Sequence, residues 1–167
     1  MYHHVDSHVC SLREHTFTAT VDGDILAWNR TNVHCILRLS DKSKSPLVSL
    51  LPLADLLLSL HEDGSVCVWD GIGAVKFKGG PMADTSSLLL ARHTIPPSLG
   101  QPTSFLHPDT YINKVAIGTA EGAVAILNFR SGAIIHVCKV LPPGTPVTAL
   151  AQSPVVDVVG VGVSFFI

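Results

Sequence analysis

One eight-residue pattern occurs three times in this chain and limits the folds open to it. Each copy begins with an acidic residue and glycine, continues with alternating aliphatic residues, and ends with Trp or Leu before Asn or Asp. The copies align without a gap and start 41 and 58 residues apart: DGDILAWN at 22–29, DGSVCVWD at 63–70 and EGAVAILN at 121–128. Repeats at such a period indicate small supersecondary units that bury their hydrophobic faces against their neighbours.

Runs rich in β-forming residues flank every copy of the pattern. An acidic residue and glycine between two such runs indicate a tight hairpin, because glycine supplies the positive φ that the turn requires. We therefore expect about four short strands in each unit. The runs are 16–21, 56–62 and 114–120 before the copies, 33–40, 74–79 and 132–140 after them, and 46–54 and 102–108 ahead of the second and third units.

The second copy indicates a sheet that is covered on both faces. Val66 and Val68 share one face of the strand, and Cys67 and Trp69 share the other. Inner strands of propeller blades are buried in this way. A period of ~40–45 residues with a Trp-Asp ending is typical of WD repeats, although the Gly-His dipeptide common upstream in such repeats is missing here.

We predict an all-β fold, a partial WD-repeat β-propeller with about three recognisable four-stranded blades plus partial ones. The first blade is entered near its second strand, and runs at 147–154 and 155–163 begin a fourth blade. Because a closed propeller needs about four to eight blades, we interpret the chain as a fragment, a truncated gene product or a partial propeller that a partner completes. The expected divisions are an N-terminal tail at 1–8, the propeller at 9–163, a long inter-blade loop at 79–102 and a truncated end at 164–167.

Two parts of this prediction leave alternatives. The run SSLLLARH inside 79–102 fits either a short strand or a helical turn. Phe165, Phe166 and Ile167 fit either a docking surface for another chain or the cut face of a propeller.

From residue 102 to roughly 162 the chain resembles a known family. It is similar to the first propeller of the tandem-propeller WD-repeat subunits of the UTP-B module of the small-subunit processome. The similarity between 9 and 79 is at the level of the ordinary WD pattern. The residues that carry the resemblance are His107, Pro108, Thr110, Tyr111, Asn113, Lys114, Gly118, Gly122, Asn128, Ser131, Val147, Leu150, Gln152, Pro154 and 156–159.

The resemblance implies a scaffold that acts by binding. Members of that family help to assemble the nucleolar, snoRNA-associated processome on pre-ribosomal RNA, so the implied partners are other processome subunits. The runner-up interpretation is a WD-repeat adaptor in another complex, such as a ubiquitin ligase or a trafficking coat. A hydrolase built on a propeller is a third, and it would need a polar cluster at the central channel.

Charge places nucleic acid second among the expected partners. Eleven Lys and Arg stand against thirteen Asp and Glu, so the chain has no basic surplus to neutralise phosphates. Contact with pre-rRNA or snoRNA is therefore expected to be secondary. Charged residues make up only 14% of the chain, against ~25% in typical soluble domains, which suggests a surface that is normally covered. The basic residues that come closest to clustering are Lys42, Lys44, Lys76 and Lys78, which we interpret as a solvated rim.

The residues that could take part in catalysis or metal binding are better explained by structural roles. Ser59, His61 and Asp63 share one stretch, but we expect Ser59, Asp63 and Trp69 to hydrogen-bond within the blade. Gly71-Ile72-Gly73 is not expected to open a helix or to bind phosphate. We predict no catalytic residue, no cofactor, no small-molecule substrate and no metal site. The most metal-like group is His3, His4, Asp6 and His8, which we interpret as a frayed terminus.

The remaining expectations concern the repeat positions and the compartment. Four separated cysteines without a C-x-x-C pair indicate reduced core residues, and no run is long enough to span a membrane or to act as a signal peptide, so we expect an intracellular protein. The family resemblance implies the nucleus and the nucleolus as its location. The cysteines are Cys10, Cys35, Cys67 and Cys138. The structural repeat positions are Asp22, Gly23, Trp28, Asp63, Gly64, Trp69, Glu121, Gly122 and Asn128.

Overall fold

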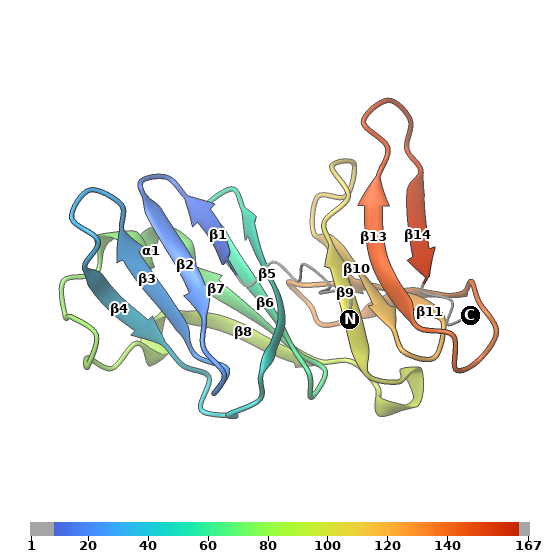
Figure 1. Ribbon diagram of the computed structural model, residues 1–167, viewed down its shortest axis with the longest axis horizontal. Coiled ribbons are helices and arrows are strands. Elements are labelled where there is room, and N and C mark those ends of the chain that lie inside the picture. Colours follow the sequence, from blue (N-terminus) through green and yellow to red (C-terminus); the bar gives the residue numbers. More distant parts are fainter. Residues whose placement is uncertain (1–8, 164–167) are drawn as a thin grey trace.

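The computed structural model describes residues 9–163, which form three four-stranded antiparallel sheets and one two-stranded sheet (Figure 1). In every sheet the strands pair in chain order, so each sheet is a blade. Blade 1 comprises β1 (Val9–Leu12), β2 (His15–Ala19), β3 (Ile25–Asn29) and β4 (Cys35–Leu39). Blade 2 comprises β5 (Leu47–Leu53), β6 (Leu56–His61), β7 (Ser65–Asp70) and β8 (Leu89–Thr94). Blade 3 comprises β9 (Pro102–Leu106), β10 (Lys114–Thr119), β11 (Ala123–Asn128) and β12 (Ile134–Lys139), and the two-stranded blade 4 comprises β13 (Val147–Gln152) and β14 (Val159–Val163).

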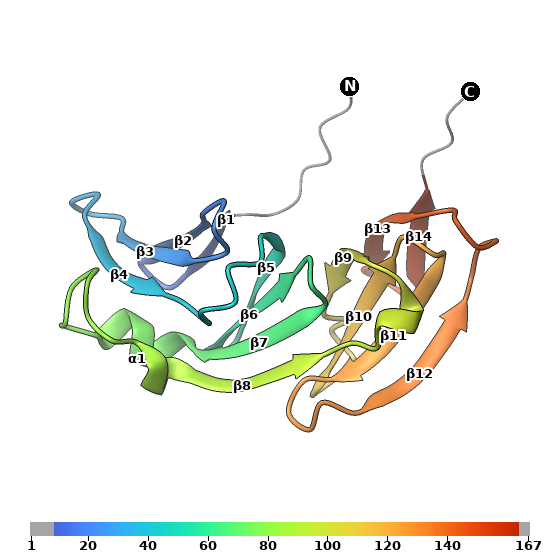
Figure 2. The same ribbon diagram turned by 90° about the horizontal axis from the view of Figure 1, so that it is seen from below.

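The blades stack side by side as in a propeller, and Figure 2 shows them fanning out in chain order. The first strands of successive blades lie against one another, β1 on β5, β5 on β9 and β9 on β13. This arrangement confirms the predicted all-β partial propeller. No helix among the described residues has the length and apolar character needed to cross a bilayer.

The three acidic-glycine pairs form the predicted hairpin turns between the second and third strands of blades 1 to 3. Gly23, Gly64 and Gly122 have φ of 80°, 84° and 77°, a region that residues with a Cβ rarely adopt. At Gly23 the turn is also crowded, because a Cβ there would clash with the carbonyl oxygen of Ser45. The glycines of the repeat pattern therefore set the register of each blade.

The two faces of β7 are both covered, as its sequence predicts. Cys67 and Trp69 belong to the core between blades 1 and 2, whereas Val66 and Val68 belong to the core between blades 2 and 3. All four side chains are at most 4% exposed. Blade 2 is thus packed between two neighbours.

Four expectations about the chain path are wrong. Residues 74–79 are not a strand, because a short helix, α1 (Gly71–Lys76), begins where Gly71-Ile72-Gly73 was expected not to open one. The side chain of Asp70 caps this helix by accepting a hydrogen bond from the backbone N of Gly73 at 2.7 Å. Ala74 is buried against the core, which holds the helix in place.

The fourth strand of blade 2 comes instead from the segment expected to be a long loop. Residues 79–102 contain a 3₁₀ turn at Ser86–Leu88, strand β8 and a second 3₁₀ turn at Pro97–Leu99. SSLLLARH therefore holds both a helical turn and a strand. Blade 1 is also not entered at its second strand, since β1 pairs with β2 from Val9 to Leu12.

The cysteines are all free, but only one lies fully in the core. Cys67 is buried, whereas Cys10, Cys35 and Cys138 are half-buried. Burial raises the pKa of the Cys10 thiol to about 11. Two groups considered in the sequence fall outside the described residues: the cluster of His3, His4, Asp6 and His8, and the terminal Phe165, Phe166 and Ile167.

Candidate functional site

Blade 2 contains a buried chain of hydrogen bonds that joins β7 to β6 and to the segment before β5. The indole Nε1 of Trp69 donates to Ser59 Oγ at 3.0 Å, and this oxygen lies 3.0 Å from His61 Nε2. His61 Nδ1 lies 3.0 Å from the carbonyl oxygen of Ser45. Because a carbonyl can only accept, Nδ1 carries the proton and Nε2 accepts from the Ser59 hydroxyl. Each polar atom of this chain is paired, as buried groups require.

The pair Ser59 and His61 has the contact of a nucleophile and a base but not the setting for catalysis. An activated serine needs access to substrate and a histidine that a third group orients, normally a carboxylate. Both side chains are fully buried, and His61 Nδ1 faces a backbone carbonyl. The geometry supports a role in holding the blade together.

Asp63 does not join this network, contrary to the prediction for Ser59, Asp63 and Trp69. Its Oδ1 accepts from the backbone N of Ser65 at 2.9 Å, and its Oδ2 accepts from Arg92 Nη2 at 3.2 Å. The reason is position: Asp63 lies in the exposed hairpin turn, while His61 at the end of β6 points into the blade.

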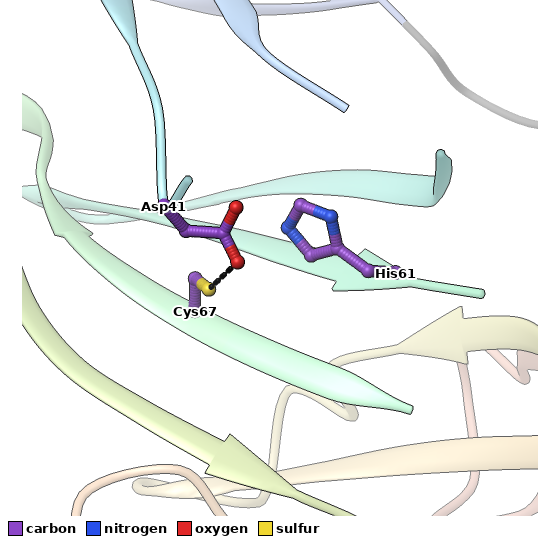
Figure 3. A group of neighbouring side chains, drawn as sticks. All are labelled: Asp41, His61 and Cys67. Carbon is purple, nitrogen blue, oxygen red and sulfur yellow. Dashed lines mark hydrogen bonds between the residues drawn. The ribbon is translucent and has the colours of Figure 1, made fainter. Parts of the chain in front are cut away.

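Asp41, His61 and Cys67 form a compact group beside this network (Figure 3). One potential ligand atom from each lies within 4.8 Å of the others. The Cys67 Sγ donates to Asp41 Oδ2 at 3.7 Å, and Arg92 Nε donates to the same oxygen at 3.2 Å. The group therefore connects the loop before β5 with β6, β7 and β8.

The electrostatics of this group suit a hydrogen-bonded support better than a metal site. Burial, together with the negative charge of Asp41, raises the pKa of the Cys67 thiol to about 12, so it is protonated at neutral pH, whereas metals bind the thiolate. Burial favours the neutral form of Asp41. Hydrogen bonds from Ser43, the electrostatic influence of nearby His61 and a hydrogen bond from Arg92 outweigh this effect and hold the pKa of Asp41 below its usual value. A cation would have to displace Arg92 from Asp41 and one partner of His61, either Ser59 Oγ at Nε2 or the Ser45 carbonyl oxygen at Nδ1.

The positions of Trp69 and Ser59 in blade 2 are filled differently in blades 1 and 3. In blade 1, Trp28 Nε1 donates to Thr18 Oγ1 at 2.9 Å, matching the pair of Trp69 and Ser59. In blade 3 the aligned residues are Leu127 and Ile117, both fully buried. The indole and its hydroxyl partner are therefore replaced together by an apolar pair, which leaves no buried polar group unpaired.

The other predicted repeat positions lie at turns. Asp22 and Glu121 are exposed, and Glu121 Oε2 accepts from the backbone N of Gly144 at 3.2 Å. Asn128 Oδ1 accepts from the backbone N of Arg130 at 3.0 Å and so closes the turn after β11. These residues shape the blade edges.

Sequence reasoning missed a second buried carboxylate, Asp24, directly after the first turn glycine. Its side chain is 2% exposed, accepts from Arg38 Nε at 2.8 Å and lies 3.6 Å from Lys44 Nζ. Burial opposes its charge, but hydrogen bonds from Ser40 and Arg38 lower its pKa. The available signal was an Asp where the other copies have Ser65 and Ala123.

The four lysines considered as a basic cluster divide between two segments. Lys42 and Lys44 lie in the loop before β5, whereas Lys76 ends α1 and Lys78 follows it. All four are exposed. Lys44 pairs with Asp24, so one of the four positive charges is already balanced by a carboxylate.

A groove of about 440 Å³ lies between blade 3 and β14 and is the candidate interaction site. On the face of β11 and β12 that points toward it, Ile126 is half-buried and His136 is exposed. The aligned residues in blade 1, Ala27 and Leu37, are fully buried by blade 2. Residues that line the groove include Lys114, Ile126, Ile135, His136, Val159 and Val161.

Comparison with solved structures agrees with the propeller architecture. The chain superposes on Raptor from Chaetomium thermophilum with a TM-score of 0.72 at 15% identity, covering 93% of this chain and 14% of that one. It also matches the computationally designed Ika4 protein with a TM-score of 0.64 at 16% identity, covering 93% and 88%. These likenesses show the fold.

Sequence comparisons identify the relatives. The chain is 28% identical to human WD repeat-containing protein 36 over 119 residues, 71% of this chain and 12% of that protein. It is 43% identical to the Schizosaccharomyces pombe U3 small nucleolar RNA-associated protein 21 homolog over 60 residues, 36% of this chain and 6% of that protein. The chain thus spans a small part of either relative. Residues 3–165 match the family model of the WDR36/Utp21 first β-propeller, and the chain therefore belongs to this family.

Proposed function

We propose that the chain is a non-catalytic WD-repeat scaffold of the small-subunit processome, acting in pre-rRNA processing in the nucleolus. The observation that carries this proposal is the family match over residues 3–165, together with the relative named for its association with U3 small nucleolar RNA. In this role the chain holds protein subunits in position and performs no chemistry of its own.

Protein contacts are the main binding mode in this proposal, and contact with pre-rRNA or snoRNA is secondary. The net charge of −2 gives little attraction for phosphates. Apolar side chains such as Ile135, 52% exposed, and Ile112, 85% exposed, are available for protein neighbours instead. A membrane or a small-molecule substrate has no place in this role.

The test is purification of the tagged protein from cells with and without ribonuclease. We expect small-subunit processome proteins and U3 RNA to co-purify, and the proteins to remain after the RNA is digested. Trp69→Ala, which disrupts the core of blade 2, is expected to lose both. Met82→Asp is the matched control, because Met82 is 94% exposed, and it should behave like the wild type.

Two results would contradict the proposal. Recovery of ubiquitin-ligase or trafficking-coat subunits in place of processome proteins would favour the alternative adaptor role. Loss of every protein partner after ribonuclease treatment would make RNA the primary contact.

A further inference from the structure

We propose that residues 77–88, which join α1 to β8, form an intramolecular strap that closes the outer edge of β4 against an added strand. The strand that the strap excludes is β4 of a second copy of the chain. This inference is independent of the proposed cellular role, because it concerns only the edge of blade 1 and a segment of blade 2. Both lie within the described residues.

Of the three four-stranded blades, only blade 2 has such a connection. The third and fourth strands are joined by 30–34 in blade 1 and by 129–133 in blade 3, whereas blade 2 uses the much longer 71–88. Figures 1 and 2 show this connection leaving blade 2 and running beside β4 before it returns to β8. The longer connection therefore reaches the neighbouring blade, which a tight turn cannot do.

One polar contact and one apolar contact hold the strap on blade 1. Thr85 Oγ1 donates to the backbone carbonyl oxygen of Arg38 in β4 at 2.9 Å, and Thr85 is only 5% exposed. Leu88, at the other end of the 3₁₀ turn, belongs to the same core as Leu37 and Leu39 of β4. The strap is thus packed against blade 1 and does not project into solvent at these residues.

The carbonyl oxygen of Arg38 lies on the edge of β4 that has no strand partner. Among the described residues β4 pairs with β3 alone. The hydrogen bond from Thr20 N to the carbonyl oxygen of Asp24 closes the hairpin of β2 and β3, and hydrogen-bonded pairs alternate from there, so Leu26 bonds to Thr18 of β2. Because Arg38 is opposite Leu26, its backbone groups point away from β3. The strap therefore fills an acceptor that an added strand would use.

A comparison of the three outer strands shows why β4 needs this cover. None of the five residues of β4 is exposed, whereas β8 and β12 have three exposed residues each. The exposed residues of β8 and β12 include Arg92 and Lys139, and basic side chains on an edge disfavour strand addition. In β4 the one charged residue is Arg38, whose Nε donates to Asp24 Oδ2 at 2.8 Å. A strand this apolar, with its charge neutralised, is a template for another strand when its edge is open.

Thr85→Glu tests the strap, because a carboxylate cannot donate to the carbonyl oxygen of Arg38 and is costly to bury there. Ser87→Glu is the matched control, since Ser87 lies in the same segment and is exposed. Thr85→Ser keeps the hydroxyl and is the conservative variant. Each 167-residue protein is followed by hydrogen exchange and by sedimentation velocity over a range of concentrations.

At low concentration we expect amides of 35–39 to exchange about tenfold faster in Thr85→Glu than in the wild type. Thr85→Ser and Ser87→Glu should exchange like the wild type. At high concentration Thr85→Glu should form larger species than the wild type does, and exchange at 35–39 should become slow again as the edges pair. Exchange in β6 and β7 should be the same in every protein, which shows that the blades stay folded.

Three outcomes would overturn the proposal. They are unchanged exchange at 35–39 in Thr85→Glu, an equal effect of Ser87→Glu, and association of Thr85→Glu that protects another strand in place of β4. If Thr85→Glu also speeds exchange in β6 and β7, Thr85→Ala replaces it, because this change removes only the hydroxyl and one methyl group. Exchange at 35–39 should then be about threefold faster than in the wild type, and the absence of any acceleration would overturn the proposal as well.

Discussion

Blades 2 and 3 have the same four strands in the same order, yet they differ in how well they are covered. In blade 2, Val68 on one face of β7 is 4% exposed and Trp69 on the other is 1% exposed. In blade 3, Leu127 is fully buried against blade 2, while the aligned Ile126 is only half-buried beside the groove. Burial in this fold depends on the neighbouring blade as much as on the strand.

The difference also decides where polar groups can sit. Blade 2 keeps a fully paired network of Trp69, Ser59 and His61 because two blades and the loop before β5 enclose it. Blade 3 has Leu127 and Ile117 in the places of Trp69 and Ser59 and carries the exposed His136 at its open face. A buried network and an open groove thus arise from the same repeat.

The largest effect is expected from a charge placed on the covered face. Val68→Asp buries an unpaired carboxylate and should lower the free energy of unfolding by about 3–5 kcal/mol. Ile126→Asp, at the aligned position beside the groove, should cost less than half as much because water reaches it. Urea unfolding measures both, and equal losses would contradict the difference between the two faces.

Loss of the buried indole is next. Trp69→Ala should destabilise the chain by about 3–5 kcal/mol, since it leaves a large cavity and removes the indole donor to Ser59 Oγ. Trp28 in blade 1 is half-buried, so Trp28→Ala should cost about half as much. Thermal and urea unfolding check this ratio, and it fails if the two substitutions are equivalent.

A smaller effect should follow from Ser59→Ala. Removing the hydroxyl leaves Trp69 Nε1 and His61 Nε2 without a partner in the core, at a cost of about 1–3 kcal/mol. Thr18→Ala in blade 1 should cost less, because water can reach the half-buried Trp28. An identical loss at both positions would show that enclosure does not matter.

The smallest effect is a pH dependence from Asp41. Its pKa in the folded chain is below the usual value, so its charge stabilises the fold above about pH 4, and that contribution is lost as the pH falls through the folded pKa. The melting temperatures of the wild type and Asp41→Asn should therefore differ more at pH 7 than at pH 3. A difference that does not shrink on acidification would contradict the role of the carboxylate.

Much of the fold follows from local patterns in the sequence. The positive φ of Gly64 and the two covered faces of β7 are consequences of the turn glycine and of alternation, which act over a few residues. The family resemblance between 102 and 162 is confirmed by the family match. These features need no knowledge of distant contacts.

The wrong predictions concern features that depend on contacts between residues far apart in the sequence. Arg92 reaches Asp41 across 51 positions of sequence, and this contact ties β8 into a blade from a segment that reads as a loop. Helix α1 depends on the cap from Asp70 and on burial of Ala74 in the core between blades 1 and 2, which override a strand-like composition. His61 joins the network in place of Asp63 because of which side chain points inward, which spacing alone does not determine.

Hydrogen exchange of the 167-residue chain tests the central claim, that blade 2 is enclosed and the face of blade 3 toward β14 is open. We predict slow exchange for amides of β6 and β7 (Leu56–His61 and Ser65–Asp70) and fast exchange for β12 and β14 (Ile134–Lys139 and Val159–Val163). Equal protection of these two sets would contradict the account, because it would mean that the groove is closed in the free chain.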